Sequence, residues 1–170
     1  NLVGRLQTPD GLIHLAPQLY LDDLERVERT FFVATTATKK FPLSLVSRRL
    51  PRSHNSWTHN SHRLVKGKNQ CTLLVNSDDA SEMNLSSGQM AQVKSKIGEL
   101  TVGVEVSDEM MPGVVSIPHG WGHDIDGMQM RTARLQPGVN VNDLTDESVV
   151  DELTGNACFS GIPVSVHPIR

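Results

Sequence analysis

The chain has few cysteines and lacks a long apolar run. Its 170 residues include only two cysteines, Cys71 and Cys158, each among the apolar or small residues that suit a buried free thiol. They form no Cys-x-x-Cys pair, which argues against a disulfide scaffold, an iron–sulfur site and the strongest zinc signature. No window approaches the roughly 18 apolar residues that a membrane-spanning helix needs. We therefore expect a soluble protein without membrane insertion; its compartment is open, with the cytoplasm as the first expectation.

A strong net charge and the short catalytic signatures are also absent. The formal net charge is -3 and the pI is about 6.2, so no general field attracts nucleic acid. No nucleophile elbow, Walker phosphate loop or Gly-x-Gly-x-x-Gly element occurs. His119 and His123 are four residues apart, a spacing that binds zinc on a helix. Gly120 and Gly122 disfavour a helix there, so we expect no metal ligands and a binding domain without its own reaction centre.

The length of the chain suits one domain with an N-terminal extension. Residues 1–17 contain Gly and Pro turns. Over residues 18–30, apolar residues recur at three-residue spacing, with acidic residues early and arginines late. This pattern predicts a short amphipathic helix. We therefore expect a linker with a short helix over 1–40 and the main domain over 41–170. Because the first residue is Asn1, we expect a processed chain or a piece of a longer one.

Beyond residue 40 the chain has brief runs rich in Val, Ile and Leu, separated by Gly and Pro, which predict short β-strands. Short strands without long helices between them favour a closed or sandwiched sheet, because closure removes strand edges that would aggregate. We expect a mainly β fold, a small barrel with short helices. The predicted strands are 43–46, 72–75, 90–94, 100–106, 113–117 and 162–166.

The segment from Arg48 to Asn60 holds three arginines, two histidines and one aromatic residue. Guanidinium groups present a fixed fork of donors that matches phosphate, and Asn and Ser can bind the edges of a polar ring. A solvated basic turn is the alternative, and composition alone weighs the two about evenly. The candidate binding residues in this loop are Arg48, Arg49, Arg52, Asn55, Ser56, Trp57, His59 and Asn60.

Three further loops carry polar side chains after predicted strands. The loop after 72–75 offers an amide and a carboxylate that either meet a ligand or cap a helix. In the loop 118–124 two glycines flank a tryptophan, so the backbone can approach a flat ligand that the indole covers. The loop 138–146 is rich in Asn and Asp, which are also ordinary turn residues. The candidates in these loops are Asn76, Asp79, His119, Gly120, Trp121 and Asn140.

The order of these loops resembles the C-terminal cofactor-binding domain of molybdopterin-dependent oxidoreductases, the dimethyl sulfoxide reductase superfamily that includes formate dehydrogenases and nitrate reductases. The resemblance spans almost the whole chain. Two positions depart from the family pattern: Ser77 replaces the usual Pro, and His54 stands where Asn is common. The matching segments are 5–17, 48–60, 76–80, 118–123, 140–142 and 161–164.

The resemblance implies a six-stranded double-psi β-barrel that binds molybdopterin guanine dinucleotide, two copies of which hold molybdenum or tungsten. It implies that the loop 48–60 holds the pterin and phosphates, with His119, Trp121 and Asn140 closing over them. Asp79 is the candidate acceptor for the N–H donors of guanine. The metal ligand and any iron–sulfur cluster belong to upstream domains of the same oxidoreductase, so the chain alone is expected to be catalytically silent.

Two alternatives remain at this point. A stand-alone barrel enzyme would need a self-processing serine or an Asp-Thr-Gly motif, and neither is present. A non-enzymatic interaction module would bind polyanions with strong salt dependence and no preference for a guanine dinucleotide.

Overall fold

The structure, a computed structural model, describes residues 3–30 and 40–169. The chain divides into two compact units, residues 1–36 and residues 37–170. The domain boundary expected between residues 40 and 41 stays a prediction. No helix within the described residues is long and apolar enough to cross a membrane.

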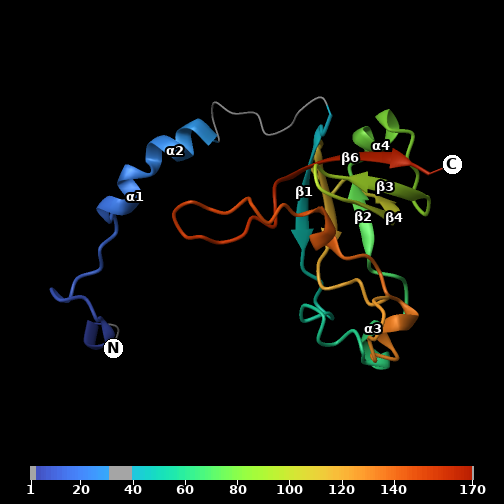
Figure 1. Cartoon of the computed structure of the whole chain (residues 1–170), viewed down its shortest axis with the longest axis horizontal. Coiled ribbons are helices and arrows are strands. Elements are labelled where there is room, and N and C mark those ends of the chain that lie inside the picture. The colour runs from blue at the N-terminus through green and yellow to red at the C-terminus, as the bar shows by residue number, and fades with distance from the viewer. Residues whose placement is uncertain (1–2, 31–39, 170) are drawn as a thin grey trace. The chain divides into compact units, whose positions relative to one another are not determined.

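The N-terminal unit contains a short 3-10 helix, Val3–Arg5, and two α-helices, α1 (Gln18–Asp22) and α2 (Leu24–Glu28) (Figure 1). The single helix predicted over 18–30 is therefore wrong in its continuity, because Asp23 separates two five-residue segments. The Asp23 carboxylate accepts two hydrogen bonds of 2.6 Å from the guanidinium of Arg26. Neither helix has a buried residue, and the large apolar side chains of Leu15, Leu19 and Leu24 are exposed.

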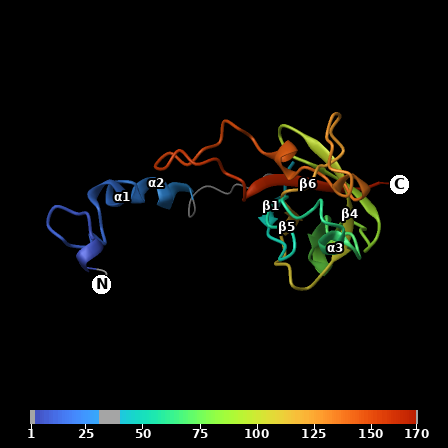
Figure 2. The same cartoon turned by 90° about the horizontal axis from the view of Figure 1, so that it is seen from below.

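The second unit is a closed barrel of six strands. All six predicted strands are confirmed, with ends that differ by at most two residues. Two hydrogen-bonded neighbours surround every strand, in the order β1-β5-β2-β4-β3-β6 (Figures 1 and 2). The strands are β1 (Leu43–Arg48), β2 (Thr72–Val75), β3 (Met90–Lys94), β4 (Glu99–Val106), β5 (Val114–Pro118) and β6 (Ile162–Pro168).

The strand pairing has an internal two-fold pattern. The pairs β1–β5 and β2–β4 are parallel, and the other four pairs are antiparallel. If β1, β2 and β3 are exchanged with β4, β5 and β6, respectively, every strand pair and its direction are reproduced. Two interlocked halves of this kind make a double-psi β-barrel, which confirms the expected fold class.

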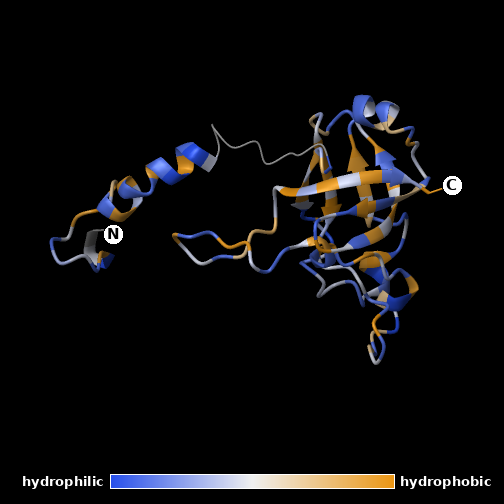
Figure 3. Ribbon diagram, turned by 45° about the horizontal axis from the view of Figure 1, so that its top comes forward, coloured by the Kyte–Doolittle hydropathy of each residue, from blue (hydrophilic) through white to orange (hydrophobic). Residues whose placement is uncertain are grey.

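Alternation along the strands places apolar side chains inside the barrel. In β4 the side chains of Leu100, Val102 and Val104 are buried, whereas Thr101 between them is exposed. Leu45, Leu73, Val93, Ile117 and Val164 fill the centre of the core. Full burial of such a side chain contributes about 1.5–3 kcal/mol, so this core holds the barrel closed. Figure 3 shows the hydrophobic residues on the strands.

The two ends of the barrel differ. At one end β1 and β5 finish and β2 begins, and here lie the loops 48–60 and 118–124 together with α3 (His62–Val65). We call this the loop end. The opposite end carries α4 (Ser77–Glu82), which follows β2 (Figure 1). Two 3-10 helices, Ala133–Leu135 and Val141–Leu144, lie in the segment between β5 and β6.

Candidate functional site

The loops 48–60 and 118–124 contact each other at the loop end. The His59 ring packs on the Trp121 indole with centroids 4.1 Å apart. The His59 Nδ1 atom lies 2.7 Å from His123 Nε2, and His119 Nε2 lies 2.9 Å from Asn55 Oδ1. The structure therefore brings four predicted site residues together, although the two loops are about 60 residues apart in sequence.

Close approach of the two backbones requires glycine at two positions. Gly120 has φ +86°, and a Cβ on it would lie 2.5 Å from the carbonyl oxygen of Asn55. Gly122 has φ +103°, and a Cβ on it would lie 2.7 Å from the Cβ of Asn140. No side chain fits at such distances without a backbone shift. Gly120 is thus a contact residue of the loop junction, and Gly122 lies against Asn140. The expected contact between Gly120 and a ligand stays a prediction.

His59 and His123 form a buried pair. Their exposed fractions are 2% and 3%, and one ring must donate a proton to the other across the 2.7 Å contact. Burial lowers the pKa of both rings, and the neighbouring His123 lowers that of His59 further. Protonation of the pair is therefore disfavoured.

Two buried nitrogen atoms at this junction have no hydrogen-bond partner among the described residues. They are His59 Nε2 and Trp121 Nε1. An unsatisfied buried polar group costs about 1–3 kcal/mol, so native proteins rarely keep one without a functional reason. Both side chains line the same cavity, although the two nitrogen atoms themselves have almost no accessible surface.

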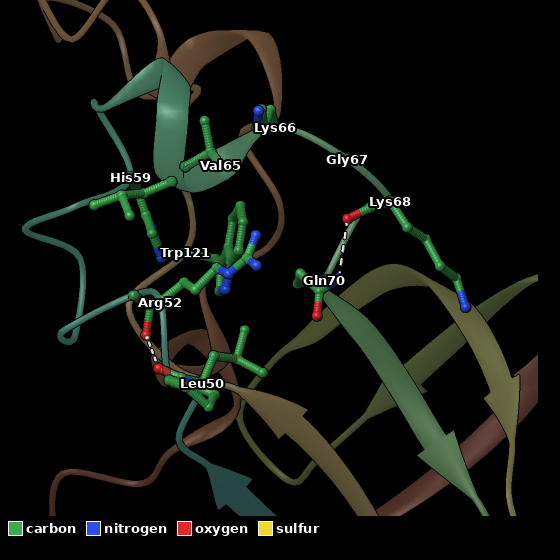
Figure 4. Close-up of a pocket in the computed structure, with 12 residues that line it drawn as sticks. Leu50, Arg52, His59, Val65, Lys66, Gly67, Lys68, Gln70 and Trp121 are labelled. Atoms are coloured by element: carbon green, nitrogen blue, oxygen red, sulfur yellow. Dashed lines mark hydrogen bonds between the residues drawn. The ribbon is translucent and has the colours of Figure 1, made fainter.

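The cavity has a volume of about 410 Å³ and lies between the loop 48–60 and the segment from α3 to β2 (Figure 4). Leu50, Leu64, Val65 and Trp121 provide apolar walls. The cations Arg52, Lys66 and Lys68 also line it, and none of the described residues in its wall carries a carboxylate. A pocket of this size that combines apolar walls with polar side chains is typical of a small-molecule site.

Arg48 is turned into the fold. Its guanidinium donates to the carbonyl oxygens of Ser116 and Thr72 at 2.5 and 2.8 Å, and to the Thr72 hydroxyl at 2.9 Å. Burial lowers the pKa of Arg48. These contacts connect β1 to β5 and β2 directly beneath the two loops. The expected contact between Arg48 and a phosphate stays a prediction.

Other predicted residues of the loop 48–60 differ in their placement. The exposed Arg49 donates to Asn55 Oδ1, and Ser56 is half-buried. Trp57 is 81% exposed and meets the His54 ring edge-on, so its indole is available to a ligand or partner. Asn60 Oδ1 accepts hydrogen bonds from the backbone N–H groups of residues 132 and 133.

Asn76 and Asp79 lie at the opposite end of the barrel. Asn76 caps α4, because its Oδ1 accepts from the Asp78 N–H and its Nδ2 donates to the Met110 carbonyl. Asp79 Oδ2 accepts from the Gly113 N–H at 2.7 Å. The capping role foreseen for this loop is confirmed at Asn76, and guanine recognition by Asp79 stays a prediction. Asn140 caps the 3-10 helix that follows it in the same way, by accepting from the Asn142 N–H.

The sequence did not single out Lys66, Leu64 or Val65 as site residues, nor His123 as more than a rejected zinc ligand. A signal existed for Lys66, because the run Lys66-Gly67-Lys68 continues the cationic character of the loop before it. No such signal existed for the pairing of His59 with His123. Within residues 3–30 and 40–169 no group of three metal-ligating side chains occurs.

Comparison with known proteins connects this geometry to a family. Residues 43–163 match the family model described as the molydopterin dinucleotide binding domain. The chain is 31% identical over 156 residues to the dimethyl sulfoxide/trimethylamine N-oxide reductase of Cereibacter sphaeroides, covering 82% of this chain and 18% of that protein. It is 30% identical over 141 residues to the molybdopterin-containing subunit of the arsenate respiratory reductase of Chrysiogenes arsenatis, covering 74% of this chain and 16% of that subunit.

A solved structure shares the fold. The acetylene hydratase from Pelobacter acetylenicus superimposes with a TM-score of 0.65 at 18% identity, covering 94% of this chain and 24% of that one. The chain spans less than a fifth of the length of the curated relatives named above. Because the family model matches well over half of the chain, the resemblance noted in the sequence is confirmed: this chain belongs to the molydopterin dinucleotide binding domain family.

Proposed function

We propose that the chain binds molybdopterin guanine dinucleotide at the loop end of the barrel, as one domain of a larger molybdenum or tungsten oxidoreductase. The observation that carries the proposal is the junction of the loops 48–60 and 118–124, where His59 and Trp121 pack beside a cationic cavity. The reductases named above extend far beyond the region matched by this chain. The rest of such an enzyme would supply the metal ligand, so the isolated chain has no activity of its own.

The residues present fit a dinucleotide of this kind. Its phosphates need cationic donors, and Arg52 and Lys66 carry charges without a partner among the described residues. Its flat heterocycle needs an apolar wall, which Leu50, Leu64, Val65 and Trp121 offer. When bound, the cofactor supplies the redox chemistry, and the side chains of this domain bind and orient it.

The structure suggests a division of roles among the predicted residues. Asn55 Oδ1 accepts from Arg49 and contacts His119, so these three form one polar cluster at the surface of the loop junction. We assign ligand contacts to this cluster and to Trp57. Arg48 is assigned a supporting role, because its donors are already bound to the backbone of β2 and β5.

Guanine recognition by Asp79 has weaker support. The carboxylate lies at the barrel end away from the cavity and already accepts a hydrogen bond from Gly113. Strand β2 has four residues, and a rise of about 3.3 Å per residue puts its two ends more than about 10 Å apart. An extended dinucleotide is longer than that distance, so the separation does not exclude contact with both His59 and Asp79. We favour a fold-stabilising role for Asp79 because its Oδ2 already accepts a hydrogen bond from the Gly113 N–H.

Other domains of the same polypeptide are the proposed partners. The N-terminal unit exposes large apolar side chains, including Leu12, Ile13, Leu15, Leu19 and Tyr20. Such a surface is unfavourable in water and suits burial against another domain. Nucleic acid is not a proposed partner, because the net charge of -3 gives no general attraction to a polyanion.

The test is titration of the chain with GMP, GDP and AMP, followed by calorimetry and by the fluorescence of its two tryptophans. We expect guanine nucleotides to bind. Their affinity should be weaker in His59→Gln and unchanged in Asp79→Ala, when equal concentrations of folded protein are compared. Loss of guanine selectivity in Asp79→Ala alone would instead establish the carboxylate as the guanine acceptor. Equal, strongly salt-dependent binding of any polyanion would favour the interaction module over the cofactor domain.

A further inference from the structure

The carboxamide of Asn55 is held in one direction by its neighbours. Its Oδ1 accepts a hydrogen bond from the guanidinium of Arg49 and lies 2.9 Å from His119 Nε2. Arginine has only donors, so the atom that Arg49 contacts must be the oxygen of the carboxamide. The amide nitrogen Nδ2 has no hydrogen-bond partner in the part of the chain that the structure describes. Because Asn55 is exposed, the two Nδ2–H donors are open to a ligand.

The same contact sets the tautomer of His119. Because Asn55 Oδ1 can only accept, His119 Nε2 must carry a proton and donate it. In the neutral ring Nδ1 is then an acceptor, and it lies 3.4 Å from the hydroxyl oxygen of Ser47. Burial lowers the pKa of His119, and the charge of Arg49 lowers it further, which favours the neutral ring. The Ser47 hydroxyl therefore donates to His119, and His119 donates to Asn55.

The barrel builds this series of hydrogen bonds. In the parallel register of β1 and β5, Ser47 pairs with Ile117 and Arg48 pairs with Pro118. The end of β1 therefore runs beside His119, the residue that follows β5, and the His119 N–H donates to the Arg48 carbonyl at 3.4 Å. Side chains placed by strands have a more precise position than side chains placed by loops. The strands thus supply a fixed support for Asn55 in the loop.

The backbone around Asn55 has an uncommon conformation. His54 and Asn55 have φ values of +41° and +61°, in the left-handed region that few residues other than glycine adopt. Gly120 lies so close to the Asn55 carbonyl that a Cβ on it would meet the oxygen at 2.5 Å. Such conformations persist where the surrounding contacts impose them, and they cluster at ligand sites. Both the backbone and the carboxamide of Asn55 are therefore fixed before a ligand arrives.

We propose that Ser47 and His119 are positioning residues that direct the Nδ2–H donors of Asn55 towards an acceptor of the ligand, the carbonyl oxygen of a flat heterocycle. The inference rests on the proposed function, in which Asn55 contacts the pterin cofactor. It adds Ser47 to the site and states what Asn55 contributes. The Asn55 oxygen already accepts two hydrogen bonds, so Asn55 offers donors and no free acceptor. The exposed Trp57, two residues further along the loop, offers a flat face to the same ring.

The first test uses two pteridines with opposite hydrogen-bonding groups. Pterin carries a carbonyl oxygen where 2,4-diaminopteridine carries an amino group. Calorimetry with the 170-residue chain should show at least about tenfold tighter binding of pterin, because the amino group would face the Asn55 donors with another donor. Asn55→Asp should reverse this preference, since Asp offers acceptors and also tolerates a positive φ. A folding defect weakens both ligands together and cannot reverse their order.

Ser47→Ala tests the positioning role. Without the hydroxyl, His119 Nδ1 has lost its donor, so the ring proton can move there and Asn55 loses a hydrogen bond. The preference for pterin should fall about threefold or more. Ser47→Thr keeps the hydroxyl and should restore the preference. Ser44→Ala is the matched control, because Ser44 lies on the same strand and its hydroxyl has no partner among the described residues.

A second readout needs no ligand. Nitrogen NMR of the histidine rings distinguishes the two neutral tautomers, and the spectrum of His119→Gln identifies the His119 signals by their loss. We expect the tautomer with the proton on Nε2 in the unmodified chain and in Ser47→Thr. In Ser47→Ala a mixture of both tautomers should appear.

The outcomes separate this inference from the proposed function. An unchanged His119 tautomer and an unchanged pterin preference in Ser47→Ala would overturn the positioning role, whereas pterin binding itself would still support the cofactor domain. Equal affinity for the two pteridines would overturn the donor role of Asn55. If guanine nucleotides bind and neither pteridine does, the cofactor domain stands and the inference fails. If none of these ligands binds, both fail.

Discussion

His59 Nδ1 lies 2.7 Å from His123 Nε2, inside the junction of two loops that 64 residues separate in the sequence. The contact joins the cationic loop after β1 to the glycine-rich loop after β5. Because β1 and β5 are parallel neighbours, their ends meet at the same end of the barrel. The barrel thus determines which loops can share a ligand, and the histidine pair fixes how they meet.

Stability should fall on acidification because of this pair. Burial lowers the pKa of His59 and His123 below the value of 6.5 that applies to the unfolded chain. Between the pKa of the folded state and that of the unfolded state, the unfolded chain binds more protons than the folded chain. The contribution of the pair to the free energy of unfolding is therefore complete above pH 6.5 and decreases as the pH falls. Urea unfolding at several pH values should show this decrease, and His123→Phe should reduce its slope. A profile that is flat below neutrality would contradict the buried neutral pair.

Gly120→Ala should destabilise the chain more than Gly127→Ala. Both glycines have positive φ, +86° and +84°, so the two changes share the same backbone strain of about 1 kcal/mol. Only at Gly120 would the new Cβ also meet the Asn55 carbonyl, at 2.5 Å, whereas the space around Gly127 is open. The difference in unfolding free energy should exceed about 1 kcal/mol. Equal losses would show that the two loops do not touch in solution.

Arg48→Met should cost about 2–4 kcal/mol of unfolding free energy, because it leaves the carbonyls of Ser116 and Thr72 without donors. Arg49→Met is the control: Arg49 is exposed, and its removal should change stability by less than about 0.5 kcal/mol. Arg49→Met should instead weaken the ligand, since Arg49 contacts the surface cluster of Asn55. If Arg48→Met weakened ligand binding without changing stability, Arg48 would be shown to contact the ligand directly.

Asn76→Ala should lower stability by about 1–2 kcal/mol and leave nucleotide affinity unchanged. The change removes the cap of α4 and the hydrogen bond to the Met110 carbonyl. Asn142→Ala, at an exposed position, serves as the control and should have little effect on either quantity. Nucleotide binding that is lost in Asn76→Ala while the chain stays folded would place a ligand contact at the α4 end.

The sequence alone determined the strands of the barrel and the loops of interest. Brief runs rich in Val, Ile and Leu with Gly or Pro between them are local signals, so all six strands were predicted to within two residues. The cap at Asn76 was also foreseeable, because capping involves residues two positions apart. The helix over 18–30 was predicted as continuous on local spacing alone, and that spacing did not reveal the interruption at Asp23.

Only the tertiary structure decided which candidate residues share a site. Barrel closure brings His59 to His123 and Trp121, turns Arg48 towards Thr72 and Ser116, and puts Asp79 at the far end. These contacts join residues from different strands and loops, and strand order and direction create them. No local pattern encodes such an order, because the same alternating strands fit several topologies. The sequence thus supplied the chemical groups, and closure of the barrel selected which of them meet.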